Sequence, residues 1–159
     1  MSESAETLIG VISDTHGLLR AEAIAALRGC DLIVHAGDVG SPDVLDRLGE
    51  LAPVRAVRGN IDTQSWARRL PETEVVEAGA LLLWVLHDIA ALDLDPAAGF
   101  AAVIFGHSHK PSIEMRSGAL YFNPGSAGPR RFKLPISLAR LTISGARVQA
   151  KLVTLEIAK

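Results

Sequence analysis

The segment LIGVISDTH at residues 8–16 is a short apolar run that ends abruptly in polar and ionisable side chains. Four later segments repeat this pattern, each with a mainly apolar run in front of a polar cluster: LIV at 32–34, VRAV at 54–57, LLLWVL at 81–86 and AVIF at 102–105. Runs of this length and composition are typical of strands buried on both faces of a sheet. We therefore predict an α/β fold whose strands carry polar clusters at their carboxyl ends.

Helical patterns separate the first three of these strands. The first, at residues 18–28, has an apolar stripe at helical spacing and ends at Gly29. The second begins at the tripeptide SPD at 41–43, which supplies an N-cap, a proline in the first turn and an acidic residue that suits the helix dipole. The amino-terminal half therefore reads as βαβαβ, which implies parallel strands joined by right-handed crossovers.

The second half of the chain is predicted to be mostly β. Residues 74–77 and 81–86, separated by Gly79, resemble a tight strand pair, and a short helix is expected at 93–98. Further strands are expected at 112–115, 119–122, 136–143 and 147–155. The expected fold class is α/β, a layered α/β/β/α sandwich in which a second sheet is stacked on the first. The whole chain, 1–159, is expected to form one domain with a mobile tail at 1–6.

Composition limits the classes of partner. The formal net charge of −2 gives no overall field that would draw the protein to nucleic acid or to an anionic membrane. No apolar run approaches the roughly 20 residues that a membrane span needs, and no signal peptide is visible. Cys30 is the only cysteine, which excludes an internal disulfide. We expect a cytoplasmic protein in which Cys30 is a small buried side chain near a helix end.

The polar clusters collect residue types that bind divalent metal ions: Asp14, His16, Asp38, Asn60, His87, His107 and His109. They include four of the five histidines of the chain. Ligands of open α/β sheets bind beyond the carboxyl ends of the strands. Carboxylate, imidazole and amide donors suit Mn²⁺, Fe²⁺, Ni²⁺, Co²⁺ or Zn²⁺ better than Ca²⁺ or Mg²⁺. This many ligands suit two ions that share a carboxylate, an arrangement that clamps both ends of an in-line displacement at phosphorus.

The order and spacing of these blocks resemble the signature of the calcineurin-like metallophosphoesterases, and most of all their small single-domain bacterial and archaeal phosphodiesterases. The matching blocks are DTH at 14–16, GD at 37–38, GNID at 59–62, His87 and GHSH at 106–109. The segment NPGS at 123–126, followed by PR at 129–130, also looks like this branch. The resemblance extends from about residue 8 to about residue 140, and five blocks in order are far more specific than one.

The resemblance implies a phosphoesterase with two divalent metal ions per chain, Mn²⁺ being the first choice. One ion would be held by Asp14, His16 and His109, and the other by Asn60, His87 and His107. Asp38 would bridge both ions, and a hydroxide between them would attack the ester. Asp38, Asn60 and His107 would thus act on the reaction through the ions. The implied substrate is a small phosphate ester, with a diester favoured over a monoester.

Ile61 departs from the pattern of the wider superfamily. Many members carry a histidine at this place, where it donates a proton or stabilises charge near the leaving group. Isoleucine cannot transfer a proton, and general acid catalysis typically contributes roughly 10²–10⁴-fold. We therefore expect weak activity on esters with poor leaving groups and better activity on activated aryl esters. The small phosphodiesterase branch often lacks this histidine too.

Other polar residues near the blocks have structural explanations. Asp62 is read as a turn residue or a hydrogen-bond partner of the site, and His35 as a strand residue with a satisfied hydrogen bond. Asp88 is read as a partner of the site or a surface carboxylate. Arg58 is read as a loop brace or a solvated side chain.

The GHSH and NPGS segments leave two further questions. On an extended segment, His107 and His109 would point to one face and Ser108 to the other. In the loop at 123–130, turn formation explains most of the sequence, while Asn123, Ser126 or Arg130 remain candidates for substrate contact. 

Two other functions are compatible with the sequence. One is an interaction protein, as in the retromer-type subunit that resembles this branch; Ile61 favours this reading and the retained ligands oppose it. The other is a nuclease, which the near-neutral charge and the aromatic content of 4% oppose. A homo-oligomer is also compatible, because the late apolar strands leave sheet edges that need cover.

Overall fold

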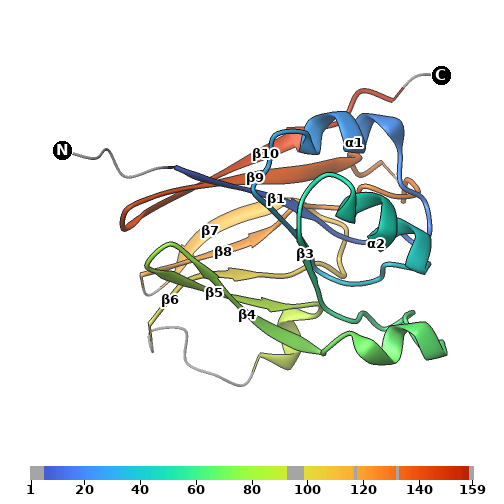
Figure 1. The fold of residues 1–159 in the computed structure, drawn as a ribbon, viewed down its shortest axis with the longest axis horizontal. Helices are drawn as coiled ribbons and strands as arrows, with labels where there is room; N and C mark the ends of the chain where they lie inside the picture. The colour runs from blue at the N-terminus through green and yellow to red at the C-terminus, as the bar shows by residue number, and fades with distance from the viewer. Residues whose placement is uncertain (1–5, 93–98, 117, 132, 158–159) are drawn as a thin grey trace.

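The computed structural model describes residues 6–92, 99–116, 118–131 and 133–157. Ten strands in these segments form two five-stranded sheets, which are stacked on each other (Figure 1). The strand order is β10-β9-β1-β2-β3 in the first sheet and β4-β5-β6-β8-β7 in the second. The predicted α/β sandwich of two stacked sheets is confirmed.

The first sheet contains the predicted βαβαβ unit. Its parallel strands and their connecting helices are β1 (Thr7–Ile12), α1 (Ala21–Leu27), β2 (Leu32–His35), α2 (Pro42–Gly49) and β3 (Val54–Ala56). Two antiparallel strands from the end of the chain, β9 (Ser137–Ser144) and β10 (Arg147–Thr154), extend the sheet beyond β1. The two ends of the sequence therefore share one sheet, and both helices pack on its outer face (Figure 1).

The helix α1 starts at Ala21, later than the expected residue 18. The N–H group of His16 donates to the carbonyl of Asp38 at 3.0 Å, and the N–H group of Gly17 donates to the carbonyl of Val39 at 2.8 Å. These hydrogen bonds tie the loop before α1 to the loop after β2. The N–H group of Leu18 closes a turn on the carbonyl of Thr15 at 2.9 Å, and the first helical hydrogen bonds run to the carbonyl of Arg20, so α1 begins only after this loop. By contrast, α2 begins as predicted.

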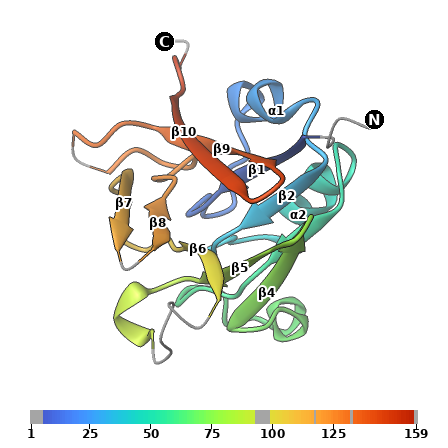
Figure 2. The same cartoon turned by 90° about the vertical axis from the view of Figure 1, so that its left-hand side faces the viewer.

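The second sheet is built from β4 (Thr73–Ala78), β5 (Leu81–Leu86), β6 (Phe100–Ile104), β8 (Ala119–Asn123) and β7 (Ser112–Arg116), which lie side by side in this order (Figure 2). The predicted β4–β5 pair is confirmed, with Gly79 in its turn at a φ of 60°. The parallel pairing of β5 with β6 and of β6 with β8 was not anticipated. The helix expected at 93–98 lies outside the described residues. The described connections contain two 3-10 helices, η1 (Ser65–Arg69) and η2 (Ile89–Ala91).

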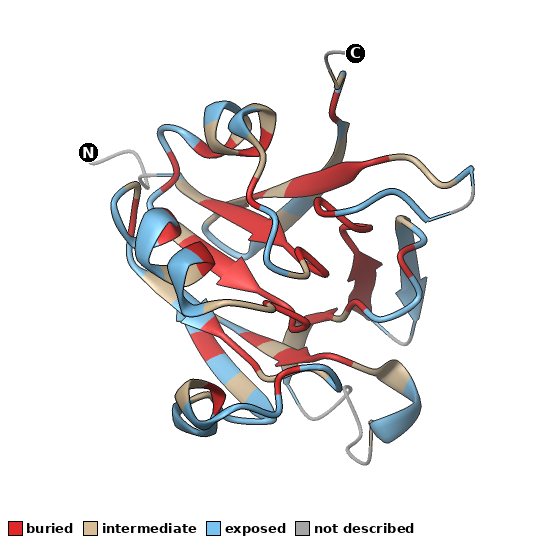
Figure 3. Cartoon of the chain, turned by 90° about the vertical axis from the view of Figure 1, so that its right-hand side faces the viewer, coloured by how far each residue is buried: buried red, intermediate tan, exposed pale blue. Residues whose placement is uncertain are grey.

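The buried core has two main layers, seen in red in Figure 3. The layer between the sheets includes Val11, Val34, Val85, Ile104 and Phe122. The layer under the helices includes Leu27, Ile33, Leu48, Leu138 and Cys30, and Cys30 is buried as expected. A smaller cluster on the outer face of the second sheet includes Leu86, Val103 and Tyr121, with η2 packed on it. None of the helices in the described residues is long and apolar enough to cross a membrane.

Candidate metal centre

The polar clusters that follow β1, β2, β5 and β6 lie next to one another because their loops are hydrogen bonded. The N–H of Asp14 donates to the carbonyl of Gly37 at 3.0 Å, and the N–H of Gly106 donates to the carbonyl of His87 at 2.9 Å. The N–H of His107 then donates to the Asp14 carboxylate at 3.1 Å, which joins the second sheet to the first. The loops of both sheets therefore contribute to a single site.

The close approach of these loops depends on two glycines. A Cβ atom at Gly59 would collide with Asp38, and a Cβ atom at Gly106 would collide with Ser13 and Asp14. Neither glycine has a positive φ, so each is needed for its missing side chain and not for its conformational freedom. The glycines of the GNID and GHSH blocks thus let neighbouring loops reach hydrogen-bond distance.

The backbone conformation singles out the same residues. Five non-glycine residues in the described segments have a positive φ: Asp14 (55°), His16 (49°), Asp38 (56°), His107 (74°) and His109 (65°). All five are candidate metal ligands. A residue held in a sparsely populated region costs roughly 1–3 kcal/mol and persists where the surroundings enforce it, commonly at functional sites. The concentration of strained backbone at these five residues indicates that their side chains are brought together for a functional reason.

The first ligand group consists of Asp14, His16 and His109, whose candidate ligand atoms lie within 4.8 Å of one another. The Oδ1 atom of Asp14 is 3.3 Å from Nε2 of His109 and 3.9 Å from Nε2 of His16. The other oxygen, Oδ2, accepts hydrogen bonds from the Ser13 hydroxyl at 2.6 Å and from the His107 N–H at 3.1 Å. One oxygen of Asp14 is therefore anchored, and the other faces three imidazole nitrogens, since Nε2 of His87 also lies 3.9 Å from it.

The second ligand group consists of Asp38, His87 and His107, and Asn60 joins it. The Oδ1 atom of Asn60 is 3.0 Å from Nε2 of His87 and 3.1 Å from Nδ1 of His107. The Nδ1 atom of His87 is 2.8 Å from the carbonyl oxygen of Ala36, which can only accept a hydrogen bond. The proton of neutral His87 therefore sits on Nδ1, which leaves Nε2 free to bind a metal ion.

Asp38 lies between the two groups. Its Oδ2 atom is 3.6 Å from Nε2 of His16 in the first group and 3.2 Å from Nε2 of His87 in the second. Its Oδ1 atom accepts the N–H of Ile61 at 3.1 Å. Burial opposes ionisation, but when no metal is bound protonated His87, whose own pKa is raised by Asp38, and the Ile61 N–H donate hydrogen bonds that outweigh it and lower the pKa of Asp38 to about 2. An ionised oxygen of Asp38 therefore faces ligands of both groups.

Unpartnered buried atoms show that the site fits metal cations. Among the described side chains that are not exposed, four nitrogen or oxygen atoms are buried without a hydrogen-bond partner: Asp14 Oδ1, His16 Nε2, His109 Nδ1 and Trp84 Nε1. Burial raises the pKa of the Asp14 carboxyl and lowers the pKa of the His109 imidazole, so an ion pair between them is disfavoured. Buried polar atoms normally have partners. Divalent cations bound by carboxylate and imidazole would satisfy Asp14 Oδ1 and His16 Nε2.

Asp62 braces the site, in agreement with the sequence interpretation. Its buried carboxylate accepts three backbone N–H groups, from Val39 at 3.0 Å, Gly40 at 2.9 Å and Gly59 at 2.9 Å. These bonds tie the loop after β2 to the loop after β3. Each of those loops carries a candidate ligand, so Asp62 sets the distance between them.

We expect Asp62→Asn to lower the free energy of unfolding by about 3 kcal/mol, because the amide keeps one acceptor oxygen and turns its own N–H₂ group toward N–H donors. Urea unfolding of chelator-treated protein measures the change. The control is Asp88→Asn, where a partly exposed carboxylate accepts a single N–H from Ala90; its loss should not exceed about 1 kcal/mol. Equal losses in the two variants would contradict the bracing role.

His35 is a core residue, which confirms the sequence interpretation. Its Nδ1 atom accepts the N–H of Gly37 at 3.1 Å, and its Nε2 atom lies 3.0 Å from the hydroxyl oxygen of Thr15. The Thr15 hydroxyl in turn donates to the carbonyl of Val39 at 2.8 Å, so Nε2 of His35 is the donor. Burial lowers the pKa of His35 to about 4. The bracing roles of Thr15 and Ser13 were not predicted, although both stand next to Asp14.

Asp88 and Arg58 occupy the rim of the site. Asp88 caps η2, and its carboxylate lies 4.0 Å from Nε2 of His107. Arg58 forms an ion pair with Glu72 at 3.1 Å. Arg58 thus braces a loop, which was one of its two expected roles, whereas the capping of η2 by Asp88 was not predicted.

The prediction of an extended segment at His107 and His109 is wrong. Both residues have left-handed φ angles, and the N–H of Ser108 donates to the carbonyl of Gly106 at 2.9 Å, so the chain forms a tight turn. Because of this turn, His107 joins the second group and His109 joins the first. The Ser108 hydroxyl accepts a hydrogen bond from the side chain of Asn123 at 3.1 Å.

The NPGS segment at 123–126 holds the loops after β1 and β6 in place through hydrogen bonds. The buried side chain of Asn123 donates to the carbonyl of Gly106 at 3.0 Å, and the buried hydroxyl of Ser126 donates to the carbonyl of Asp14 at 2.9 Å. Arg130 is exposed. Burial and hydrogen bonding explain Asn123 and Ser126 without any contact to a substrate.

The fold and the paired ligand groups define the class of the metallophosphoesterases. The chain belongs to the calcineurin-like phosphoesterase superfamily, whose domain model matches residues 8–146. A probable metallophosphoesterase of Methanothermobacter thermautotrophicus is 35% identical over 92% of this chain and 91% of its own length. Phosphodiesterase YfcE of Escherichia coli is 29% identical over 81% of this chain and 84% of its own.

Solved structures share the fold. A predicted phosphoesterase from Streptococcus pneumoniae superposes with a TM-score of 0.71 at 27% identity, covering 94% of this chain and 90% of that one. Vps29 of Entamoeba histolytica, solved in complex with Zn²⁺, has a TM-score of 0.70 at 22% identity and covers 93% of this chain and 99% of its own. At this identity, the likeness to Vps29 shows a shared fold and nothing about function. The resemblance inferred from the sequence blocks is thus confirmed at the level of the family.

Proposed function

We propose that the protein hydrolyses small phosphodiesters with two divalent metal ions held side by side. One observation carries the proposal above the others: a single oxygen of Asp38, whose pKa is about 2, lies 3.6 Å from a nitrogen of His16 and 3.2 Å from a nitrogen of His87. An ionised carboxylate placed between two ligand groups is what a shared site requires.

The proposed ligands are Asp14, His16 and His109 for one ion and Asn60, His87 and His107 for the other, with Asp38 shared. The paired ions would supply a hydroxide nucleophile and positive charge that stabilises the phosphoryl oxygens, and Mn²⁺ suits this mixed oxygen and nitrogen donor set. The remaining groups orient the ligands, since the Ser13 hydroxyl fixes Asp14 and the Ala36 carbonyl fixes His87. The catalytic contribution of the fold is thus to hold the metal-binding side chains at defined distances from one another.

Three features support a small diester as the substrate. A relative is named a phosphodiesterase. Ile61 offers no proton to a poor leaving group, which favours esters with activated leaving groups. The formal net charge of −2 opposes tight binding of a polyanion such as nucleic acid.

The test is hydrolysis of bis(p-nitrophenyl) phosphate and p-nitrophenyl phosphate by chelator-treated protein, before and after addition of Mn²⁺ or Ni²⁺. We expect activity to appear only with metal, to be greater on the diester, and to fall at least roughly 10²-fold in His109→Ala. Metal should also raise the melting temperature of the wild type, because it binds only the folded state.

Lys110→Ala, an exposed substitution in the same loop, is the control and should behave as the wild type. A folded protein that binds metal yet hydrolyses neither ester would refute the proposal. That result would leave a binding role without catalysis as the remaining interpretation.

A further inference from the structure

A pocket of about 470 Å³ adjoins the second ligand group. Asn60, His87 and His107 form the wall that it shares with the candidate metal centre, while no residue of the first ligand group lines it. The volume falls within the range of roughly 300–1,000 Å³ that is usual for small-molecule sites. The site therefore extends laterally beside the second ligand group.

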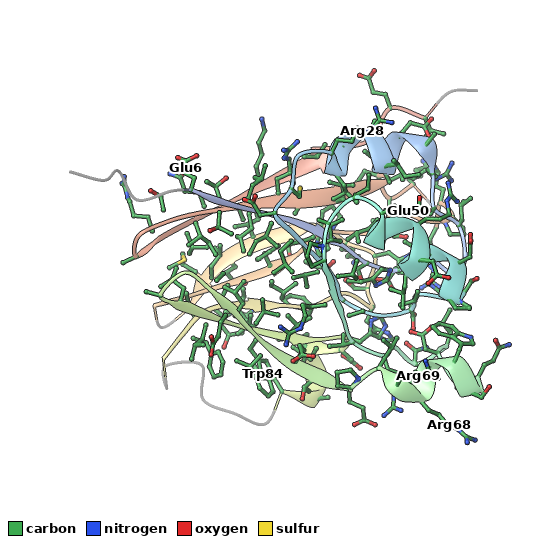
Figure 4. The ribbon with its side chains drawn as sticks, viewed as in Figure 1. Glu6, Arg28, Glu50, Arg68, Arg69 and Trp84 are labelled. Atoms are coloured by element: carbon green, nitrogen blue, oxygen red, sulfur yellow. The ribbon has the colours of Figure 1, made fainter. Side chains whose placement is uncertain are left out.

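The far wall of the pocket is the outer face of the second sheet. Trp84 and Leu86 alternate along β5 with Leu83 and Val85, which point into the core between the sheets. Figure 4 shows Trp84 on the side of this sheet that faces away from the first sheet. The Trp84 indole is held by an edge contact with Phe100, with ring centroids 5.4 Å apart. The partly exposed Trp84 indole, with the nearly buried Leu86 beside it, therefore provides an apolar surface next to the candidate metal centre.

The charged residues on the rim do not favour a second anion. Arg58 is paired with Glu72 at 3.1 Å, so its positive charge is matched within the pocket wall. Asp88 adds a further carboxylate to the lining. An anionic group in the pocket would meet two carboxylates and only one guanidinium, whereas an uncharged group would meet Trp84 and Leu86.

We propose that this pocket binds one uncharged aromatic ester group of a phosphodiester while the phosphate occupies the metal centre. The inference rests on the proposed function for the position of the phosphate. The ring packs on Trp84 and Leu86, as aromatic groups do on apolar walls. Ala91, an exposed small residue of η2 that lines the pocket, leaves the space open.

The experiment compares two slowly hydrolysed diesters, diphenyl phosphate and dimethyl phosphate, by calorimetric titration of the Mn²⁺-loaded protein. Both carry one negative charge, and only the first carries rings. We expect diphenyl phosphate to bind about tenfold more tightly or better, from the apolar area that one ring buries. In Ala91→Phe the new side chain fills the pocket, so the preference should fall to about twofold or less, with dimethyl phosphate unaffected.

Ala90→Phe is the matched control, because Ala90 is an exposed neighbour on η2 outside the pocket lining, and it should keep the full preference. Trp84→Ala should lose the preference as Ala91→Phe does. If Trp84→Ala does not fold, the test still rests on Ala91→Phe. Ala91 is exposed, so its substitution does not disturb the core.

Equal affinity of the wild type for the two diesters, or an unchanged preference in Ala91→Phe, would overturn the inference. The proposed function fails separately, through the absence of metal-dependent hydrolysis of the p-nitrophenyl diester. An active enzyme without ring preference would thus refute the pocket alone.

Discussion

Asp38→Asn is expected to lower kcat for bis(p-nitrophenyl) phosphate by about 10³-fold or more. Asparagine has the same shape and can still accept the Ile61 N–H, but it removes the negative charge that faces His16 and His87. A shared carboxylate holds the two ions close enough to stabilise charge in the transition state, an effect worth several kcal/mol. Each 1.36 kcal/mol corresponds to about tenfold in rate.

The measurement is steady-state kinetics at saturating Mn²⁺, with the metal content of each variant determined by elemental analysis. A fall from two ions per chain to about one would place the effect at the shared position. Asp46→Asn, an exposed substitution of the same kind on α2, should leave both activity and metal content unchanged. Full activity of Asp38→Asn would contradict the two-ion arrangement.

Ile61→His is expected to raise kcat/KM for alkyl phosphodiesters by about 10²-fold, at the low end of what a general acid contributes. Ile61 is 39% exposed and follows Asn60, so a histidine fits there without loss of core packing. Its backbone N–H would still donate to Asp38. Esters of p-nitrophenol should change little, because nitrophenolate leaves without protonation.

The measurement is the dependence of kcat/KM on the pKa of the leaving group across a series of diesters. A protonated histidine should make this dependence shallower and add an alkaline limb to the pH profile. Ile61→Gln is the matched control, because glutamine is polar but carries no proton at an ionisable nitrogen. If Ile61→Gln raises the rate equally, polarity and not proton transfer explains the gain.

The sequence predicted the elements of the first half with good accuracy because their signals are local. Alternation of apolar runs and polar ends gave β1, β2 and β3, and Ser41 with Pro42 marked the start of α2. The start of α1 was misplaced because the loop before it is tied by hydrogen bonds of His16 and Gly17 to residues about twenty positions later, Asp38 and Val39. No local pattern reveals a partner at that separation.

The same distinction applies to the candidate site. Residue type and position after a strand identified all the side chains that converge, since four of five histidines at strand ends have no structural explanation. The geometry at GHSH was misread because a two-residue spacing was taken to mean extended backbone. In the folded protein, the left-handed conformations of His107 and His109 send the two imidazoles to different groups.

The sequence by itself determined the family, the order of the first elements and the identity of the candidate ligands, because each depends on residue type and local periodicity. Only the tertiary structure decided how the loops meet, which oxygen of Asp38 faces both groups, and that Trp84 borders a pocket beside His87. The physical reason is that these features arise from contacts between segments far apart in the chain. Such contacts depend on sheet stacking and on close approach at Gly59 and Gly106, which no single stretch of sequence records.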